Sequence, residues 1–211
     1  MPVEAKICGL STPETLDAAV RFGARFVGFV TYPKSPRHIS TETMRALAGR
    51  VPKTVTRVGL FVDPDDALLD EKLATGALDM LQLHGAETPG RVAAIRQRTG
   101  KPVMKAIKVS IAGDVEQGIK LYAPVVDRLM FDAAEGILPG GNAKAFDWTI
   151  LSGRSIEVPW FLAGGLTPEN VAEAVRVTGA RAVDVSSGVE AERGVKSIDR
   201  IRDFLDKVKA L

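Results

Sequence analysis

Two side chains suited to acid–base chemistry each lie at the end of a short apolar run. Cys8 ends the run at residues 4–8, and Asp132 follows the continuous apolar stretch at residues 129–131. A thiolate is a competent base, and partial burial raises the pKa of a carboxyl group into the range of a general acid. The alternatives are a buried cysteine that acts as a small hydrophobe and an ordinary loop acid. If both residues reach one cavity, they form a candidate acid–base pair.

A third candidate lies in the loop at residues 32–38, where two prolines precede Arg37 and stiffen the chain. A rigidly presented guanidinium is suited to bidentate capture of a carboxylate. The alternative for Arg37 is a solvated surface side chain.

Two polar side chains are further candidates at strand ends. His84 shares a strand face with Gln82, and Asp184 shares a strand face with Ser186, because alternate residues of a strand point to the same side. Each pair could also be a satisfied polar pair inside the protein. In the apolar run at residues 4–8, the same period places Lys6 and Cys8 on one face, where Lys6 could help to form a thiolate.

Three turns rich in small residues follow the last three predicted strands. Glycine lets the backbone approach a ligand closely, and successive backbone N–H groups bind anions. The turns therefore predict a phosphate site, with ordinary turn glycines as the alternative. The residues concerned are Gly141, Gly164, Gly165, Ser186, Ser187 and Gly188.

The elements that must position these residues alternate regularly along the chain. We predict strands at residues 4–8, 26–29, 56–61, 80–83, 103–107, 128–131, 160–163 and 182–185, each followed by a helical segment. Such alternation predicts a parallel sheet with right-handed crossovers, and eight units favour a single (β/α)₈ TIM barrel over residues 1–211. An open, doubly wound sheet is the alternative. In a barrel of this kind, active sites lie at the C-terminal ends of the strands.

Helix signals support this division of the chain. Ser11 and Glu14 have the spacing of a capping box, and Gly100 lies where a helix should end. The last helix carries an apolar stripe formed by Ile198, Ile201, Leu205 and Val208.

Composition excludes several classes of function. The 211 residues carry a formal net charge of +2 without a block of Lys or Arg, so we expect no nucleic-acid partner. No apolar run is long enough for a membrane span, and we expect no membrane partner. One cysteine and two distant histidines give no zinc-type spacing, so no metal site is predicted. The lone cysteine and the absence of a signal peptide predict a cytoplasmic protein.

A set of motifs along the whole chain resembles the phosphoribosylanthranilate isomerase family. These motifs are Lys6-Ile7-Cys8-Gly9, Val27-Gly28-Phe29, Tyr32-Pro33-Lys34-Ser35-Pro36-Arg37, Val58-Gly59-Leu60-Phe61-Val62, Leu81-Gln82-Leu83-His84-Gly85, Phe146-Asp147-Trp148, Ala163-Gly164-Gly165-Leu166 and Val183-Asp184-Val185-Ser186-Ser187-Gly188-Val189-Glu190. None of the motifs is specific alone, but together and in this order they are.

The resemblance implies an enzyme of tryptophan biosynthesis that converts N-(5-phosphoribosyl)anthranilate, an aminoaldose, into 1-(2-carboxyphenylamino)-1-deoxyribulose 5-phosphate. It implies that Cys8 is the general base, Asp132 the general acid and Arg37 the residue that holds the anthranilate end. It also places His84 and Asp184 at the anthranilate side of the pocket and the small-residue turns around the phosphate. The reaction needs no cofactor, and the chain could act as a monomer or a homodimer.

Two other functions stay open at this stage. A sugar-phosphate epimerase barrel would use metal-ligating histidines and acids, and its activity would be lost on chelation. A non-catalytic barrel would bind phosphorylated ligands without turnover.

Overall fold

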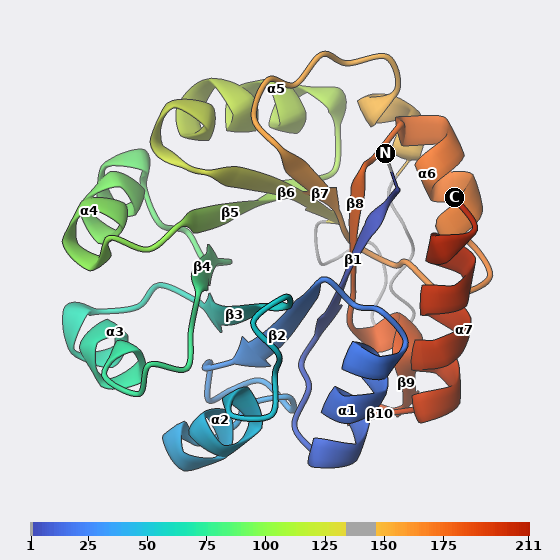
Figure 1. Cartoon of the computed structure of the whole chain (residues 1–211). Helices are drawn as coiled ribbons and strands as arrows, with labels where there is room; N and C mark the ends of the chain where they lie inside the picture. The colour runs from blue at the N-terminus through green and yellow to red at the C-terminus, as the bar shows by residue number, and fades with distance from the viewer. Residues whose placement is uncertain (1, 134–146) are drawn as a thin grey trace.

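The computed structural model of the chain describes residues 2–133 and 147–211. Eight parallel strands pair in chain order, and β1 pairs with β8, so the sheet closes into a barrel (Figure 1). The closed barrel is confirmed, and the open sheet is excluded. The strands are β1 (Glu4–Cys8), β2 (Phe26–Val30), β3 (Thr56–Phe61), β4 (Met80–Leu83), β5 (Val103–Val109), β6 (Arg128–Ala133), β7 (Trp160–Leu162) and β8 (Ala182–Val185).

Helices surround the strands, as the crossover rule for parallel strands requires (Figure 1). They are α1 (Pro13–Arg21), α2 (Thr41–Ala48), α3 (Asp66–Leu73), α4 (Pro89–Thr99), α5 (Ala112–Tyr122), α6 (Val171–Thr178) and α7 (Ile198–Lys209), with the 3₁₀ turns η1 (Ala123–Val125), η2 (Trp148–Leu151) and η3 (Ser187–Val189).

The pattern of one helix after each strand changes in two places. Between β6 and β7, the described residues hold η2 rather than an α-helix. After β8, a hairpin of two short strands, β9 (Glu190–Glu192) and β10 (Val195–Lys196), precedes α7. The sequence had not predicted this hairpin, because strands of two or three residues carry no clear hydrophobic period.

Alternating strand residues divide the core in two. One buried cluster, which includes Ile7 and Val27, lies between the barrel and its helices. A smaller cluster fills the barrel itself and includes Phe26, Met104 and Phe161. Lys6 and Cys8 therefore point inward while Ile7 points toward the helices, as the strand period predicts.

Local sequence signals predicted some features of the helices correctly and others wrongly. Gly100 ends α4 in the left-handed conformation, with φ +61°, as expected. The capping box on Ser11 was wrong, because the Thr12 side chain caps α1 by accepting from the N–H of Thr15. On α7, the predicted apolar stripe is buried except for Ile198, which lies in the first turn and is exposed.

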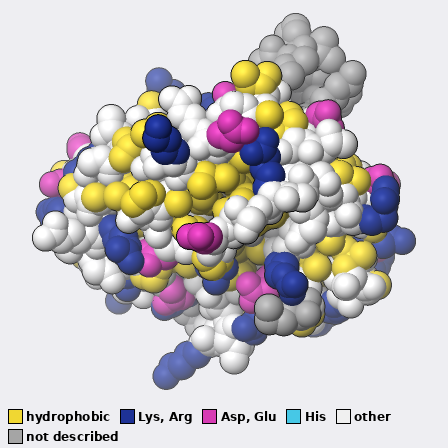
Figure 2. All heavy atoms as spheres, turned by 90° about the horizontal axis from the view of Figure 1, so that it is seen from above, with side chains coloured by type: hydrophobic (Ala, Val, Ile, Leu, Met, Phe, Trp, Pro, Cys, Tyr) yellow, Lys and Arg dark blue, Asp and Glu magenta, His cyan; other side chains and the backbone are white. Residues whose placement is uncertain are grey.

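Seen from above, the molecule presents apolar side chains across the middle of the face, with Lys, Arg, Asp and Glu interspersed around them (Figure 2). Within the part of the chain that the structure describes, no helix has the length and apolar character needed to cross a membrane.

Two glycines, one inside α4 and one at its C-terminal cap, give a matched test of the backbone. Gly90 is helical and Gly100 is left-handed, and a Cβ at either position would meet no atom within 4 Å. We expect Gly90→Ala to stabilise the protein by about 0.5 kcal/mol and Gly100→Ala to destabilise it by about 1 kcal/mol, because only the second forces an L side chain into positive φ. Urea unfolding measures both free energies, and shifts of the same sign would contradict the assignment.

Candidate active site

The predicted chemical groups gather at one end of the barrel. Because all eight strands are parallel, their C-terminal ends lie at the same end of the barrel. Cys8 is the last residue of β1, Asp132 lies one residue from the end of β6, and His84 follows β4 directly. The loops after β2, β7 and β8 contribute Arg37 and the small-residue turns at this end.

The seam between β1 and β8 forms the floor beneath the thiol. Lys6 is fully buried, and its Nζ donates to Oδ1 of Asp184 at 2.8 Å. Burial disfavours the charged form of Lys6, but the charge of Asp184, with a smaller contribution from Cys8, outweighs it and holds the pKa above its usual value. Asp184 is therefore the ion-pair partner of Lys6, in addition to any contact that it makes with a ligand.

Burial also controls the thiol. Cys8 is buried, and burial raises the pKa of its thiol above the usual value, although the charges of Lys6 and Lys196 act in the opposite direction. The sequence suggested that Lys6 could help to form a thiolate, and the charge of Lys6 does favour it, but Asp184 partly neutralises Lys6 and the effect of burial is larger. A further positive charge beside Cys8 would favour the thiolate.

Asp132 is held by a chain of polar contacts from β4. His84 Nε2 lies 2.9 Å from Asp132 Oδ2, and the Gln82 amide nitrogen lies 2.9 Å from His84 Nδ1. The side chains of Asp132 and His84 remain about one-fifth to one-quarter exposed, so both can meet a ligand. A Cβ on Gly164 would lie 2.8 Å from Asp132 Oδ1, so this glycine leaves room for the carboxyl group.

Arg37 is ordered by the hairpin that follows β8. Its Nε donates to Glu190 Oε1 at 2.6 Å and its Nη2 donates to Glu190 Oε2 at 2.8 Å. The side chain stays about one-fifth exposed. Its methylene groups lie against Gly9, where a Cβ would come within 2.8 Å of Arg37 Cδ. Arg37 therefore lies beside the cysteine strand and is not a freely solvated arginine.

The turns after β7 and β8 lie against each other. Gly164 and Gly165 have φ of +82° and +71°, which glycine adopts without strain. A Cβ on Gly188 would lie 1.8 Å from the carbonyl oxygen of Leu166, so the two turns touch at this point. Ser187 begins η3 in the same turn. The predicted turn at residues 138–142, with Gly141, lies outside the described residues.

Ser186 connects this turn to the thiol strand. Its Oγ donates to the carbonyl oxygen of Cys8 at 3.1 Å. Lys196 in turn donates to both oxygens of Ser186, at 2.9 Å to the carbonyl and 3.1 Å to Oγ.

Sequence reasoning missed two groups at the site. Lys196 is a buried cation close enough to Cys8 to affect its pKa, yet no local pattern marks it as buried. Gly28 is the register partner of Cys8, and a Cβ there would lie 3.0 Å from Cys8 Sγ and 3.1 Å from Lys6 Nζ. A glycine inside a strand is the signal that could have indicated this close approach.

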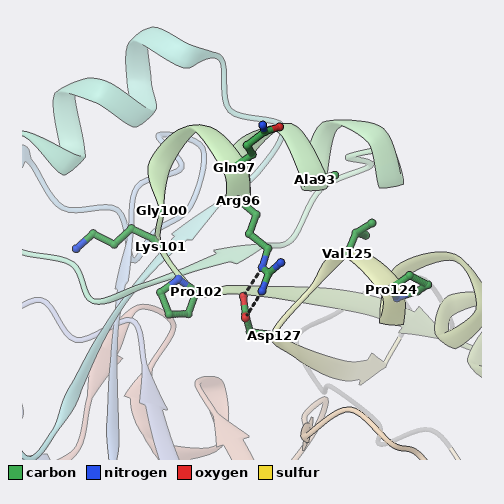
Figure 3. Close-up of a pocket in the computed structure, with 9 residues that line it drawn as sticks. All are labelled: Ala93, Arg96, Gln97, Gly100, Lys101, Pro102, Pro124, Val125 and Asp127. Carbon is green, nitrogen blue, oxygen red and sulfur yellow. Dashed lines mark hydrogen bonds and ion pairs between the residues drawn. The ribbon is translucent and has the colours of Figure 1, made fainter.

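A separate hollow lies at the opposite end of the strands (Figure 3). It is lined by Ala93, Arg96, Gln97, Gly100, Lys101, Pro102, Pro124, Val125 and Asp127, and Arg96 and Asp127 form a two-armed ion pair across it. Pro102 and Asp127 directly precede β5 and β6, so this hollow is remote from the candidate acid and base. Among residues 2–133 and 147–211, no cluster of three or more His, Cys, Asp or Glu could hold a metal ion.

The raised pKa of Cys8 gives a direct prediction. We expect the thiolate absorbance of the unliganded protein to appear at a pH above that of a free thiol, since burial opposes ionisation. Ultraviolet absorbance against pH measures this, and Cys8→Ser provides the baseline because the chain has one cysteine. A midpoint below that of a free thiol would contradict the geometry.

The protein is similar along its whole length to known isomerases. The family model for N-(5'-phosphoribosyl)anthranilate isomerase matches residues 5–207. The N-(5'-phosphoribosyl)anthranilate isomerase of Paracoccus denitrificans is 56% identical over 100% of this chain and 99% of its own, and that of Paramagnetospirillum magneticum is 55% identical over 97% and 96%.

Solved structures agree with this similarity. Phosphoribosyl anthranilate isomerase from Thermotoga maritima has a TM-score of 0.90 and 38% identity, covering 99% of this chain and 100% of its own. A phosphoribosyl anthranilate isomerase solved in complex with reduced 1-(o-carboxyphenylamino)-1-deoxyribulose 5-phosphate has a TM-score of 0.86, 38% identity and the same coverage. The Thermotoga enzyme is also described as dimeric. These matches confirm the resemblance seen in the motifs, and the chain belongs to the N-(5'-phosphoribosyl)anthranilate isomerase family.

Proposed function

We propose that this protein isomerises N-(5'-phosphoribosyl)anthranilate to 1-(2-carboxyphenylamino)-1-deoxyribulose 5-phosphate, an Amadori rearrangement in tryptophan biosynthesis. The observation that carries this proposal is that Cys8, at the end of β1, and Asp132, near the end of β6, lie at the same end of a closed barrel, in a chain of this family. Residues 1–211 act as a single barrel domain in this proposal.

Asp132 acts first, as the general acid. Its carboxyl group gives a proton to the furanose ring oxygen, the bond from that oxygen to C1 breaks, and the anthranilate nitrogen forms a C1=N⁺ imine. His84, 2.9 Å from Asp132, holds the carboxyl group in position for this transfer. The carboxyl group is partly buried, which strengthens its electrostatic interaction with the charge that develops on the substrate.

Cys8 acts second, as the general base. The imine cation acidifies the hydrogen on C2, and the thiolate removes it, so that the C2 electron pair forms a C1=C2 bond and neutralises the nitrogen. The resulting enolamine tautomerises to the ketone when C1 gains a proton and the C2 hydroxyl loses one. The cation also favours the thiolate form of Cys8, whose own proton passes to solvent before the hydrogen on C2 is removed.

The remaining residues bind the two ends of the substrate. Arg37 holds the anthranilate carboxylate, with His84 and Asp184 on the same side of the pocket. The phosphate lies in the turns after β7 and β8, which are Gly164, Gly165, Ser186, Ser187 and Gly188. The contact between Gly188 and Leu166, which joins these turns, supports this placement.

The reaction needs no added cofactor, because the substrate nitrogen is the electron sink. The lone cysteine fits a reducing compartment, and we place the reaction in the cytoplasm. The active form is a monomer or a homodimer, and the dimeric Thermotoga relative supports the second.

Fluorescence of the anthranilate group tests the function. We expect the purified chain to consume N-(5'-phosphoribosyl)anthranilate with loss of its fluorescence, at the same rate with and without a chelator. Absence of turnover at high enzyme concentration would refute the isomerase, and loss of activity on chelation would favour the epimerase class instead.

Two substitutions test the acid and the base. We expect Cys8→Ala and Asp132→Asn each to lower kcat by at least about 10²-fold, because a positioned acid or base contributes that much. The dissociation constant for reduced 1-(o-carboxyphenylamino)-1-deoxyribulose 5-phosphate should change by less than about fivefold, which corresponds to about 1 kcal/mol.

Glu192→Gln is the control, since Glu192 is exposed on β9 and should leave kcat unchanged. Near-normal turnover by either site variant would remove that residue from the mechanism.

A further inference from the structure

The hairpin β9–β10 holds a buried carboxylate against the β2 loop. Glu190 begins β9, and its side chain is only 4% exposed. It receives two parallel hydrogen bonds from Arg37, from Nε at 2.6 Å and from Nη2 at 2.8 Å. This fork geometry fixes both the position and the plane of the guanidinium.

Glu190 accepts two further hydrogen bonds. Lys196 Nζ donates to Oε1 at 2.7 Å, and the Gly194 N–H donates to Oε2 at 3.0 Å. Burial alone would raise the pKa of Glu190, but the bonds from Arg37 and Lys196 lower it to about 2. With two donors on each oxygen, this side chain stays an anion and does not take part in proton transfer near neutral pH.

The charges of this cluster do not cancel. Arg37 and Lys196 bring two positive charges, and Glu190 brings one negative charge, so one positive charge remains. The side chains of Lys196 and Glu190 are almost fully buried, whereas 21% of the Arg37 side chain is exposed. Arg37 is therefore the member of the cluster whose positive charge can act on a ligand at the C-terminal end of the barrel.

The geometry also determines which edge of Arg37 faces a ligand. Glu190 occupies the edge formed by Nε and Nη2, and within the described residues no group accepts a hydrogen bond from Nη1. The Arg37 stem cannot swing toward β1, because it already lies against Gly9. On the other side, a Cβ on Gly194 would lie 3.0 Å from the Pro36 carbonyl oxygen, so the hairpin packs directly on the loop.

We infer that Glu190 is the positioning residue for carboxylate recognition: it holds the Nε–Nη2 edge of Arg37 and so presents the Nη1 end to the substrate carboxylate. Glu190 does not touch the substrate and acts only through Arg37. This inference rests on the proposed function, and it adds a residue to which sequence reasoning gave no role.

A pair of ligands separates positioning from general structure. The first ligand is reduced 1-(o-carboxyphenylamino)-1-deoxyribulose 5-phosphate, and the second is its phenylamino counterpart without the carboxyl group. Calorimetric titration of the wild type, Glu190→Gln and the control Glu192→Gln gives six dissociation constants. We expect Glu190→Gln to weaken the first ligand at least about tenfold and the second less than about twofold, with no change in the control.

Two further comparisons keep the test informative if Glu190→Gln does not fold, and check that Glu190 acts through Arg37. Glu190→Gln leaves Lys196 buried without its anionic partner, so the double variant Glu190→Gln/Lys196→Met replaces it if the single variant does not fold. Because Lys196 also donates to Ser186 in the phosphate turn, the double variant is compared with Lys196→Met alone, and the preference for the carboxylated ligand should fall at least about tenfold between them. In the Arg37→Ala background, Glu190→Gln should cause no further selective loss, because residues that act through one contact are not additive.

The possible outcomes discriminate between the two proposals. If the wild type fails to turn over N-(5'-phosphoribosyl)anthranilate, the proposed function fails. If the wild type is active and prefers the carboxylated ligand, the inference is overturned by an equal weakening of both ligands, by no change, or by tighter binding of the first. Tighter binding would mean that Glu190 competes with the substrate carboxylate for Arg37.

Discussion

The closure of the barrel at β1 and β8 is the constraint on which the site depends. It makes Lys6 and Asp184 register partners although 178 positions separate them, and their 2.8 Å ion pair crosses the seam inside the barrel. Loss of one partner from a buried pair typically costs about 3–5 kcal/mol, because the other charge stays uncompensated. The pair therefore ties the electrostatic surroundings of Cys8 to the integrity of the seam.

The barrel interior changes from apolar to polar along its axis. Near the N-terminal ends of the strands, Phe26 and Phe161 pack edge to face, with the Arg128 guanidinium over both rings. Toward the other end, the interior holds the seam ion pair and then the groups at the mouth. Because packed side chains fill the barrel interior, water does not reach the site from that side. This strengthens electrostatic interactions between a ligand and the residues around it.

Contacts among the loops organise the mouth. The β9–β10 hairpin holds Arg37 through Glu190, and Lys196 of the same hairpin donates to Ser186, whose hydroxyl donates to the backbone carbonyl oxygen of Cys8. The arginine proposed for the carboxylate, a turn proposed for the phosphate and the backbone of the strand that carries Cys8 thus share one hydrogen-bonded network. Loss of the Lys196 contacts would therefore affect the phosphate turn and the cysteine strand as well as Glu190, without any direct contact with the substrate.

Strand period and glycine placement were enough to predict the barrel, the inward direction of Cys8 and the left-handed end at Gly100, because each depends on residues close in sequence. The motifs were also enough to indicate the family.

The sequence alone did not show that Asp184 would pair with Lys6 or Glu190 with Arg37, and it did not show that burial would raise the pKa of the Cys8 thiol. Those outcomes depend on which distant loops meet when the barrel closes and on how much water they exclude. The sequence by itself therefore determined the fold and indicated the candidate groups for the chemistry, whereas the tertiary structure decided the partners of those groups and the direction of their pKa shifts, because both arise from contacts between segments far apart along the chain.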